Sequence, residues 1–121
     1  MSELTEKIIG AAIEVHRSIG PGLLESAYQE CLCRELSLQR IPFVRELALP
    51  VEYKGARIDC DYRIDLLVDS AVVVEIKAVA TIEPVHTAQL LTYMRLGRWR
   101  VGLLMNFNVP ALRNGIRRVV L

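Results

Sequence analysis

Two acidic residues and a lysine in this sequence have the types and the spacing to do chemistry together. Asp65 is followed, after nine residues, by Glu75, and Lys77 stands two positions further on. The stretch between the acids reads as two strands around a turn, and strand residues two apart point to the same face. Carboxylate oxygens suit a hard divalent ion, which can activate water and stabilise charge on a phosphate. The pattern favours a Mg²⁺ site for cutting a phosphodiester, with Lys77 holding the attacking water; the alternative is a solvated ladder of charges on one strand face.

The turn between these strands decides whether the two acids meet. A two-residue turn sends Glu75 to the face opposite Asp65, whereas one extra residue, in a turn of residues 69–71 or in a bulge, pairs the two acids. We predict the odd-length solution. Without metal, the facing acids should repel each other, so that at least one has a raised pKa, and Lys77 should partly relieve this.

Charge is unevenly distributed along the chain, although the net charge is only +1. Residues 1–83 hold nine Lys or Arg against fourteen Asp or Glu, whereas residues 84–121 hold six arginines and no acid. An acidic metal pocket beside a basic flank suits an enzyme that acts on nucleic acid. We expect one basic, nucleic-acid-binding surface on the side of the acids, the alternative being ordinary solvated surface; its residues are Arg95, Arg98, Arg100, Arg113, Arg117 and Arg118.

Length and composition restrict the class of protein. A chain of 121 residues predicts one domain, residues 1–121, with a single core. The hydrophobic fraction is 52%, but no apolar stretch approaches the length of a membrane span, and the N-terminus lacks the basic segment of a signal peptide. We therefore attribute the apolar excess to a well-filled core and a subunit interface, which predicts a two-fold homodimer. An odd number of cysteines without metal-ligand spacing predicts buried or partly buried free thiols in a reducing cytoplasm: Cys31, Cys33 and Cys60.

Hydrophobic periodicity predicts an α/β fold with a mixed β-sheet flanked by helices, in the order α-α-β-β-β-α-β-(β). Ser2 is the expected N-cap of the first helix, and Gly97 is expected to supply a left-handed cap after the third. Apolar and polar residues alternate so regularly from Arg57 to Val68 that we expect one continuous strand there. The expected helices are residues 4–18, 24–39 and 84–96, and the expected strands are residues 43–53, 57–68, 72–77, 100–106 and 116–121.

Several separated motifs in the right order carry a family resemblance. The segment G-L-L-E-S-A-Y at Gly22 to Tyr28 resembles the signature of the GxxExxY proteins, small members of the PD-(D/E)XK nuclease-like superfamily. The similarity continues through Y-R-I-D-L-L-V, V-E-I-K-A, V-H-T-A-Q-L-L-T-Y-M and G-L-L-M-N-F. It extends from about Ile8 to Val119. The resemblance implies a restriction-endonuclease-like core.

The resemblance also implies roles for individual residues. It makes Asp65 and Glu75 the metal-binding carboxylates, with the Ile76 carbonyl as a further ligand, and Lys77 the catalytic lysine. Glu25 matches a helix glutamate that approaches the same metal.

Two further residues, Gln89 and Tyr93, resemble the Q-x-x-x-Y element of nuclease domains related to the RecB type. Ile64 stands where the superfamily usually has a proline before the first acid.

Helical spacing agrees with these roles. Glu25 and Tyr28 lie three apart on one helix face, and His86 joins Gln89 and Tyr93 on another. For Tyr28 the alternative is a core aromatic, and for His86 a hydrogen bond at the helix start is preferred to metal ligation. Gly22 is explained by backbone geometry at the helix entry.

Two functions remain open. The first is a metal-dependent phosphodiesterase that uses Mg²⁺ or Mn²⁺ on nucleic acid, DNA in preference to RNA. The second is a non-catalytic module on the same fold that binds nucleic acid or a protein partner.

Overall fold

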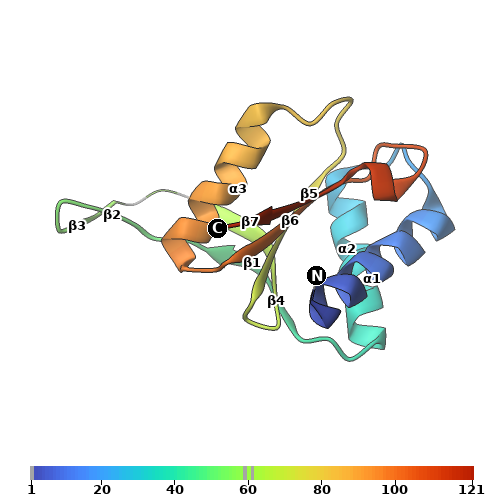
Figure 1. Ribbon diagram of the computed structural model, residues 1–121, viewed down its shortest axis with the longest axis horizontal. Helices are drawn as coiled ribbons and strands as arrows, with labels where there is room; N and C mark the ends of the chain where they lie inside the picture. Colours follow the sequence, from blue (N-terminus) through green and yellow to red (C-terminus); the bar gives the residue numbers. More distant parts are fainter. Residues whose placement is uncertain (1, 59, 61) are drawn as a thin grey trace.

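The computed structural model describes residues 2–58, 60 and 62–121. A mixed sheet of five strands, in the order β1-β4-β5-β6-β7, lies between two layers of helix (Figure 1). Helices α1 (Glu3–Ile19) and α2 (Glu25–Leu38) cover one face, and α3 (Pro84–Gly97) covers the other. The strands are β1 (Phe43–Ala48), β4 (Arg63–Val68), β5 (Val72–Lys77), β6 (Val101–Asn106) and β7 (Ile116–Val120). The predicted α/β architecture with a mixed sheet is confirmed.

Strand β5 is central and buried on both faces, as its run of apolar residues requires. Val72, Val74 and Ile76 pack in the core under α1 and α2, whereas Val73 packs under α3. By the same alternation, Glu75 and Lys77 belong to the α3 face. β5 runs parallel to β6, and the other pairings in the sheet are antiparallel.

Most predicted helix ends are confirmed. The Ser2 side chain accepts a hydrogen bond from the Thr5 N–H at the start of α1. Gly22 has φ +99°, a backbone conformation that favours glycine.

The prediction for Gly97 is wrong, because Arg98 adopts the left-handed conformation with φ 61°. Gly97 has a different reason to be small. A Cβ added there would lie 2.0 Å from the Trp99 ring, so glycine lets this ring pack on the end of α3.

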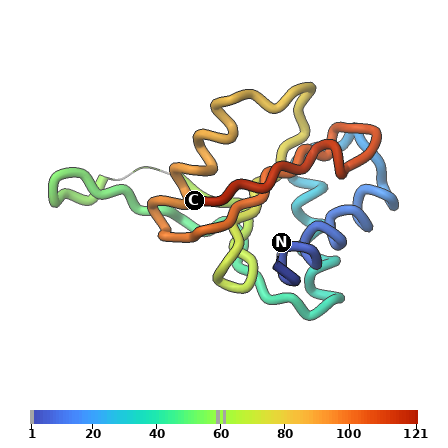
Figure 2. Tube along the Cα trace, in the orientation of Figure 1, coloured from blue at the N-terminus to red at the C-terminus, as the bar shows by residue number. Residues whose placement is uncertain are grey.

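Two long predicted strands are wrong in extent. The first stops at β1 and resumes after Leu49 and Pro50 as β2 (Val51–Tyr53), which pairs with β3 (Ala56–Ile58) instead of the main sheet. Figure 2 shows this hairpin projecting from the body. The second, predicted over residues 57–68, is divided between the end of β3 at Ile58 and β4, which begins at Arg63. Ile58 is 43% exposed and Tyr62 46% exposed, so the predicted apolar face is not part of the core between the two strands. The part of the prediction that concerns Asp59 and Asp61 lies outside the described residues.

A short helix, η1 (Leu112–Asn114), precedes β7. Over the described residues, every helix is too short or too polar to cross a membrane.

Candidate active site

The turn between β4 and β5 sets the two acids opposite each other. The strands pair Val68 with Val72 and Leu66 with Val74, which leaves a three-residue connection, residues 69–71. Continuing this register by one step places Asp65 opposite Glu75. The predicted odd-length turn is confirmed, and both carboxylates lie on the α3 face.

The regular β4–β5 ladder ends at Leu66, just before the acids. Beyond it, the side chains take over the hydrogen bonding between the strands. The Asp65 N–H donates to Glu75 Oε1 at 3.1 Å, and the Ile76 N–H donates to Asp65 Oδ2 at 2.7 Å. Each carboxylate is thus tied to the backbone at or beside the other acid, and their relative position is fixed.

The strand pair β1–β4 changes its buried face at the position of Asp65. Leu66 packs in the core under α1 and α2, but Ile64 packs in the core under α3, so the buried face changes across Asp65. On β1, Glu46 lies beside Asp65 in the register and has φ 51°. A glutamate with positive φ is unusual and marks strain. Sequence periodicity contains no signal for this change of face.

The electrostatics of the acid pair are dominated by burial. Glu75 is only 7% exposed. Burial, and then the charge of Asp65, raise its pKa from 4.5 to about 8. Burial is also the main cause that raises the pKa of Asp65, while the hydrogen bond from Ile76 and the charge of Lys77 lower it. The predicted direction for the pair is confirmed.

Lys77 is half-buried on the same face as Glu75, and its charge lowers the pKa of both acids. Its backbone is fixed by the following turn, where the Phe107 N–H donates to the Lys77 carbonyl at 2.9 Å.

Asn106, which is buried, holds the residues after Lys77 through its side-chain amide. Its Nδ2 donates to the Val79 carbonyl at 2.9 Å and its Oδ1 accepts from the Val79 N–H at 3.1 Å. Asn106, at the end of β6, thus fixes the segment that follows Lys77.

Glu25 lies at the N-terminus of α2, close to the end of β5. Its Oε2 accepts a hydrogen bond from the Ala78 N–H at 3.3 Å, and its charge raises the pKa of both Asp65 and Glu75. Tyr28 is buried, stacks on Phe107 with ring centroids 4.5 Å apart, and donates to the Gly20 carbonyl. Tyr28 therefore serves the core and fixes the loop that leads into Glu25.

Gln89 and Tyr93 lie on α3 above the acids. Burial, followed by the charge of Glu75, raises the pKa of Tyr93, and Gln89 partly offsets the rise. The Tyr93 hydroxyl therefore lies within electrostatic reach of the acid pair. His86 accepts a hydrogen bond from the Glu83 N–H at 3.0 Å, which confirms its predicted role at the helix start.

The sequence as a whole agrees with this geometry. The family model of the PD-(D/E)XK nuclease superfamily matches residues 2–119. The chain belongs to this superfamily. No curated protein and no solved structure matches the chain.

Nucleases of the PD-(D/E)XK superfamily generally use divalent metal ions, and the acid pair fits such an ion. Among the described residues, neither Asp65 nor Glu75 forms an ion pair with a basic side chain. A buried carboxylate beside a half-buried one is costly without a cation, and a divalent cation would offset both charges. Across the described part of the chain, no group of three or more His, Cys, Asp or Glu side chains is poised to hold a metal. The donor set in this structure is thus the acid pair, with Glu25 nearby but bonded to Ala78.

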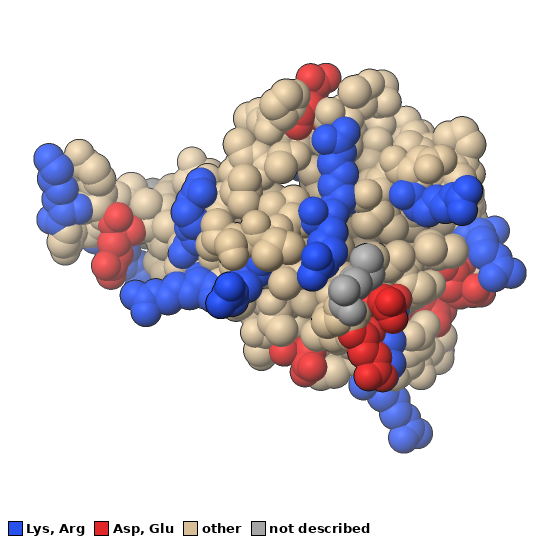
Figure 3. Space-filling view, in the orientation of Figure 1, with Lys and Arg blue, Asp and Glu red and all other residues tan. Residues whose placement is uncertain are grey.

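The six arginines do not form the single basic surface that was predicted. Opposite residues in an antiparallel pair share a face, and β7 places Arg117 beside Leu104 but Arg118 beside Leu103. Leu104 packs under α3, whereas Leu103 packs under α1 and α2. Of these two arginines, therefore, Arg117 is on the face of the acids and Arg118 is on the other face. Figure 3 shows Lys and Arg side chains in separate groups divided by uncharged surface.

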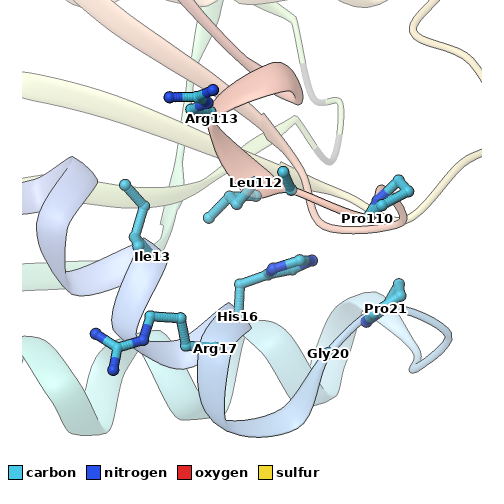
Figure 4. A pocket seen from close by; sticks show the side chains of 9 residues that line it. Ile13, His16, Arg17, Gly20, Pro21, Pro110, Leu112 and Arg113 are labelled. Carbon is cyan, nitrogen blue, oxygen red and sulfur yellow. The ribbon is translucent and has the colours of Figure 1, made fainter.

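The other four arginines lie further away. Arg113 lines a cavity of about 460 Å³ between α1 and η1, together with His16 and Arg17 (Figure 4). His16 Nε2 is hydrogen-bonded to the Val109 carbonyl at 2.8 Å, so this histidine is used structurally. Three arginines lie around the C-terminal end of α3, at the opposite end of β5 and β6 from Lys77: Arg95, Arg98 and Arg100.

Proposed function

We propose that this protein is a metal-dependent nuclease that hydrolyses phosphodiester bonds of nucleic acid, DNA in preference to RNA. The observation that carries the proposal is the acid pair. Asp65 and Glu75 lie side by side at the point where β4 leaves β5, and each carboxylate accepts a backbone hydrogen bond. Glu75 is buried and Asp65 is half-buried, and neither forms an ion pair with a basic side chain among the described residues. Membership of the PD-(D/E)XK superfamily supports the same reading.

The chain would hold Mg²⁺ or Mn²⁺ through the carboxylates of Asp65 and Glu75, with the Ile76 carbonyl as a further ligand. When bound, the ion supplies Lewis-acid stabilisation of charge on the phosphate and lowers the pKa of water. The protein's own contribution is to fix the donors in advance, which removes the cost of reorganisation during the reaction.

Lys77 is proposed to orient the attacking water, because this residue is half-buried on the same face and its charge lowers the pKa of both acids. Asn106 and Glu25 would hold the backbone that follows Lys77, at Val79 and Ala78. Tyr93 would position a phosphate or water from the α3 side, and Gln89 would help to position the substrate beside it. Arg117 is the proposed phosphate contact on this face, and the other arginines would act only on more distant nucleotides.

A cleavage screen with single-stranded, duplex and branched DNA and RNA in Mn²⁺ tests the proposal. Wild type should cleave at least one substrate and Lys77→Ala should not, while Lys54→Ala, at the exposed hairpin tip, serves as the matched control. Wild-type protein with no cleavage of any substrate, but with nucleic-acid binding that Lys77→Ala leaves unchanged, would support the binding module instead. The engagement of Glu25 by Ala78 is the observation that favours this second candidate.

Three finer assignments belong to the same proposal. We assign the chain to the GxxExxY group on its G-L-L-E-S-A-Y segment, with residues 1–121 acting as one unit in the cytoplasm. We also propose a homodimer, supported by exposed apolar side chains such as Leu24, Leu38 and Val120. Light scattering that gives a monomer mass at high micromolar concentration would remove the dimer.

A further inference from the structure

A second cavity lies on the α3 side of the sheet, and Tyr93, on which the charges of both acids act, is part of its lining. Its volume is about 500 Å³, and it is bounded by one face of α3, from Val85 to Leu96, and by Val51 and Tyr62 at the base of the β2–β3 hairpin. Both segments lie on the same side of the molecule in Figures 1 and 2. The Tyr62 carbonyl accepts a hydrogen bond from the Leu49 N–H at 2.8 Å, so the backbone of this residue is fixed.

Two residues connect this cavity to the acids. Gln89 and Tyr93 line it, and both stand on the part of α3 that is above Asp65 and Glu75. The Tyr62 and Tyr93 ring centroids are 6.1 Å apart with an interplanar angle of 53°. Tyr93 is buried, whereas Tyr62 is 46% exposed, so part of the Tyr62 ring remains free for a ligand.

The chemistry of the lining selects the kind of ligand. Among the residues that the structure describes, those that line the cavity are aromatic, aliphatic or neutral polar, and none of them is charged. The exposed Gln89 amide can donate and accept hydrogen bonds. Thr92 uses its hydroxyl proton on the Ala88 carbonyl at 3.0 Å, which leaves its lone pairs as acceptors. A flat, neutral group with polar atoms along its edge matches such a site, whereas a phosphate does not.

We propose that this cavity receives an unpaired nucleobase next to the scissile phosphate, stacked on Tyr62 and hydrogen-bonded along its edge by Gln89. The inference rests on the proposed nuclease function, because the neighbouring acids define where the sugar–phosphate backbone lies. A base inside a duplex is already stacked and paired, and it would first have to be flipped out at a cost in free energy. The substrate class that follows is single-stranded nucleic acid, or an unpaired end or flap, in preference to perfect duplex. Aromatic stacking is the usual way in which proteins hold such strands.

The test measures base stacking without cleavage. Oligonucleotides with one 2-aminopurine are bound in EDTA, and the quenching of its fluorescence is followed. Wild type should quench 2-aminopurine in a single strand but not in a duplex. Tyr62→Leu should abolish the quenching and weaken single-strand binding roughly ten-fold or more. Ala88→Phe, at an exposed position of α3, should do the same by filling the cavity, and Val44→Ala, an exposed β1 residue, is the matched control.

The outcomes separate this inference from the function on which it rests. Quenching that depends on Tyr62, without cleavage in Mn²⁺, supports the cavity as a base site and overturns the nuclease. Cleavage of duplex and single strand at equal rates, unchanged by Tyr62→Leu and Ala88→Phe, overturns the base site and keeps the nuclease. A concentration-dependent dimer that either variant dissociates, with nucleic-acid binding unaffected, shows that the cavity is covered by a second copy and also overturns the base site.

Discussion

Buried Glu75, beside Asp65, should make the metal-free protein less stable as the pH rises, and Glu75→Gln should remove most of this loss. In the folded state the pKa of Glu75 is raised to about 8, whereas its ordinary value is 4.5. The folded protein therefore binds a proton more tightly than the unfolded chain. The stabilisation that the folded state gains from binding this proton is fully present below pH 4.5 and is lost as the pH rises through 8.

The magnitude follows from the size of the pKa change. Each tenfold change in proton affinity is worth about 1.4 kcal/mol, so Glu75 should lower the free energy of unfolding by roughly 3–5 kcal/mol between these limits. Desolvation carries most of this figure, because Glu75 is almost fully buried and solvent screens it little. Asp65 titrates with Glu75 and contributes with the same sign.

Urea denaturation in EDTA at pH 5, 7 and 9 measures the effect. The glutamine amide oxygen can still accept from the Asp65 N–H, so the variant keeps the bond between the strands. Wild type should lose several kcal/mol more than Glu75→Gln between pH 5 and pH 9, while exposed Glu52→Gln follows the wild type. Parallel stability curves for wild type and Glu75→Gln would refute the argument that the acids are buried together without a cation.

Three further predictions concern the turn after β5, the end of α3 and the two arginines of β7. Asn106→Ala should destabilise by roughly 1–3 kcal/mol, because it removes two hydrogen bonds between a buried side chain and the half-buried Val79 backbone. It should also slow cleavage more than this loss of folded protein explains, and urea melts with rate measurements on the folded fraction check both. Gly97→Ala should destabilise by about 1–3 kcal/mol, since its Cβ would overlap the Trp99 ring, and an unchanged thermal midpoint would contradict this packing. Arg117→Glu should weaken nucleic-acid binding and flatten its salt dependence far more than Arg118→Glu, and equal effects in salt titrations would contradict the division of these residues between two faces.

The central part of the fold was predictable because its signals are local. The buried run of β5, the caps of α1 and the glycine before α2 each depend on a few neighbouring residues. The register between Asp65 and Glu75 was predictable for a different reason. Only an odd-length turn brings both acids to one face, so the chemistry itself restricted the geometry.

The predictions that were wrong depend on packing between residues that are far apart in the sequence. Alternation from Arg57 to Val68 cannot distinguish one long strand from a projecting hairpin followed by β4, because both have period two. The change of buried face at Asp65 depends on the divergence of β4 from β5 and on the positive φ of Glu46, which local sequence does not encode. The arginines were grouped by their position in the chain, but adjacent residues of an edge strand point to opposite faces.

Calorimetric titration of the metal-free protein with Mn²⁺ at pH 7, in buffers of different ionisation enthalpy, tests the central claim most directly. Asp65 and Glu75 should bind the ion together and release a proton, because the pKa of Glu75 lies above this pH in the free protein. Glu75→Gln should lose both the binding and the buffer-dependent heat, while Glu52→Gln should keep them. Wild-type protein that binds no Mn²⁺, or that binds it equally well after Glu75→Gln, would contradict a metal site at the acid pair.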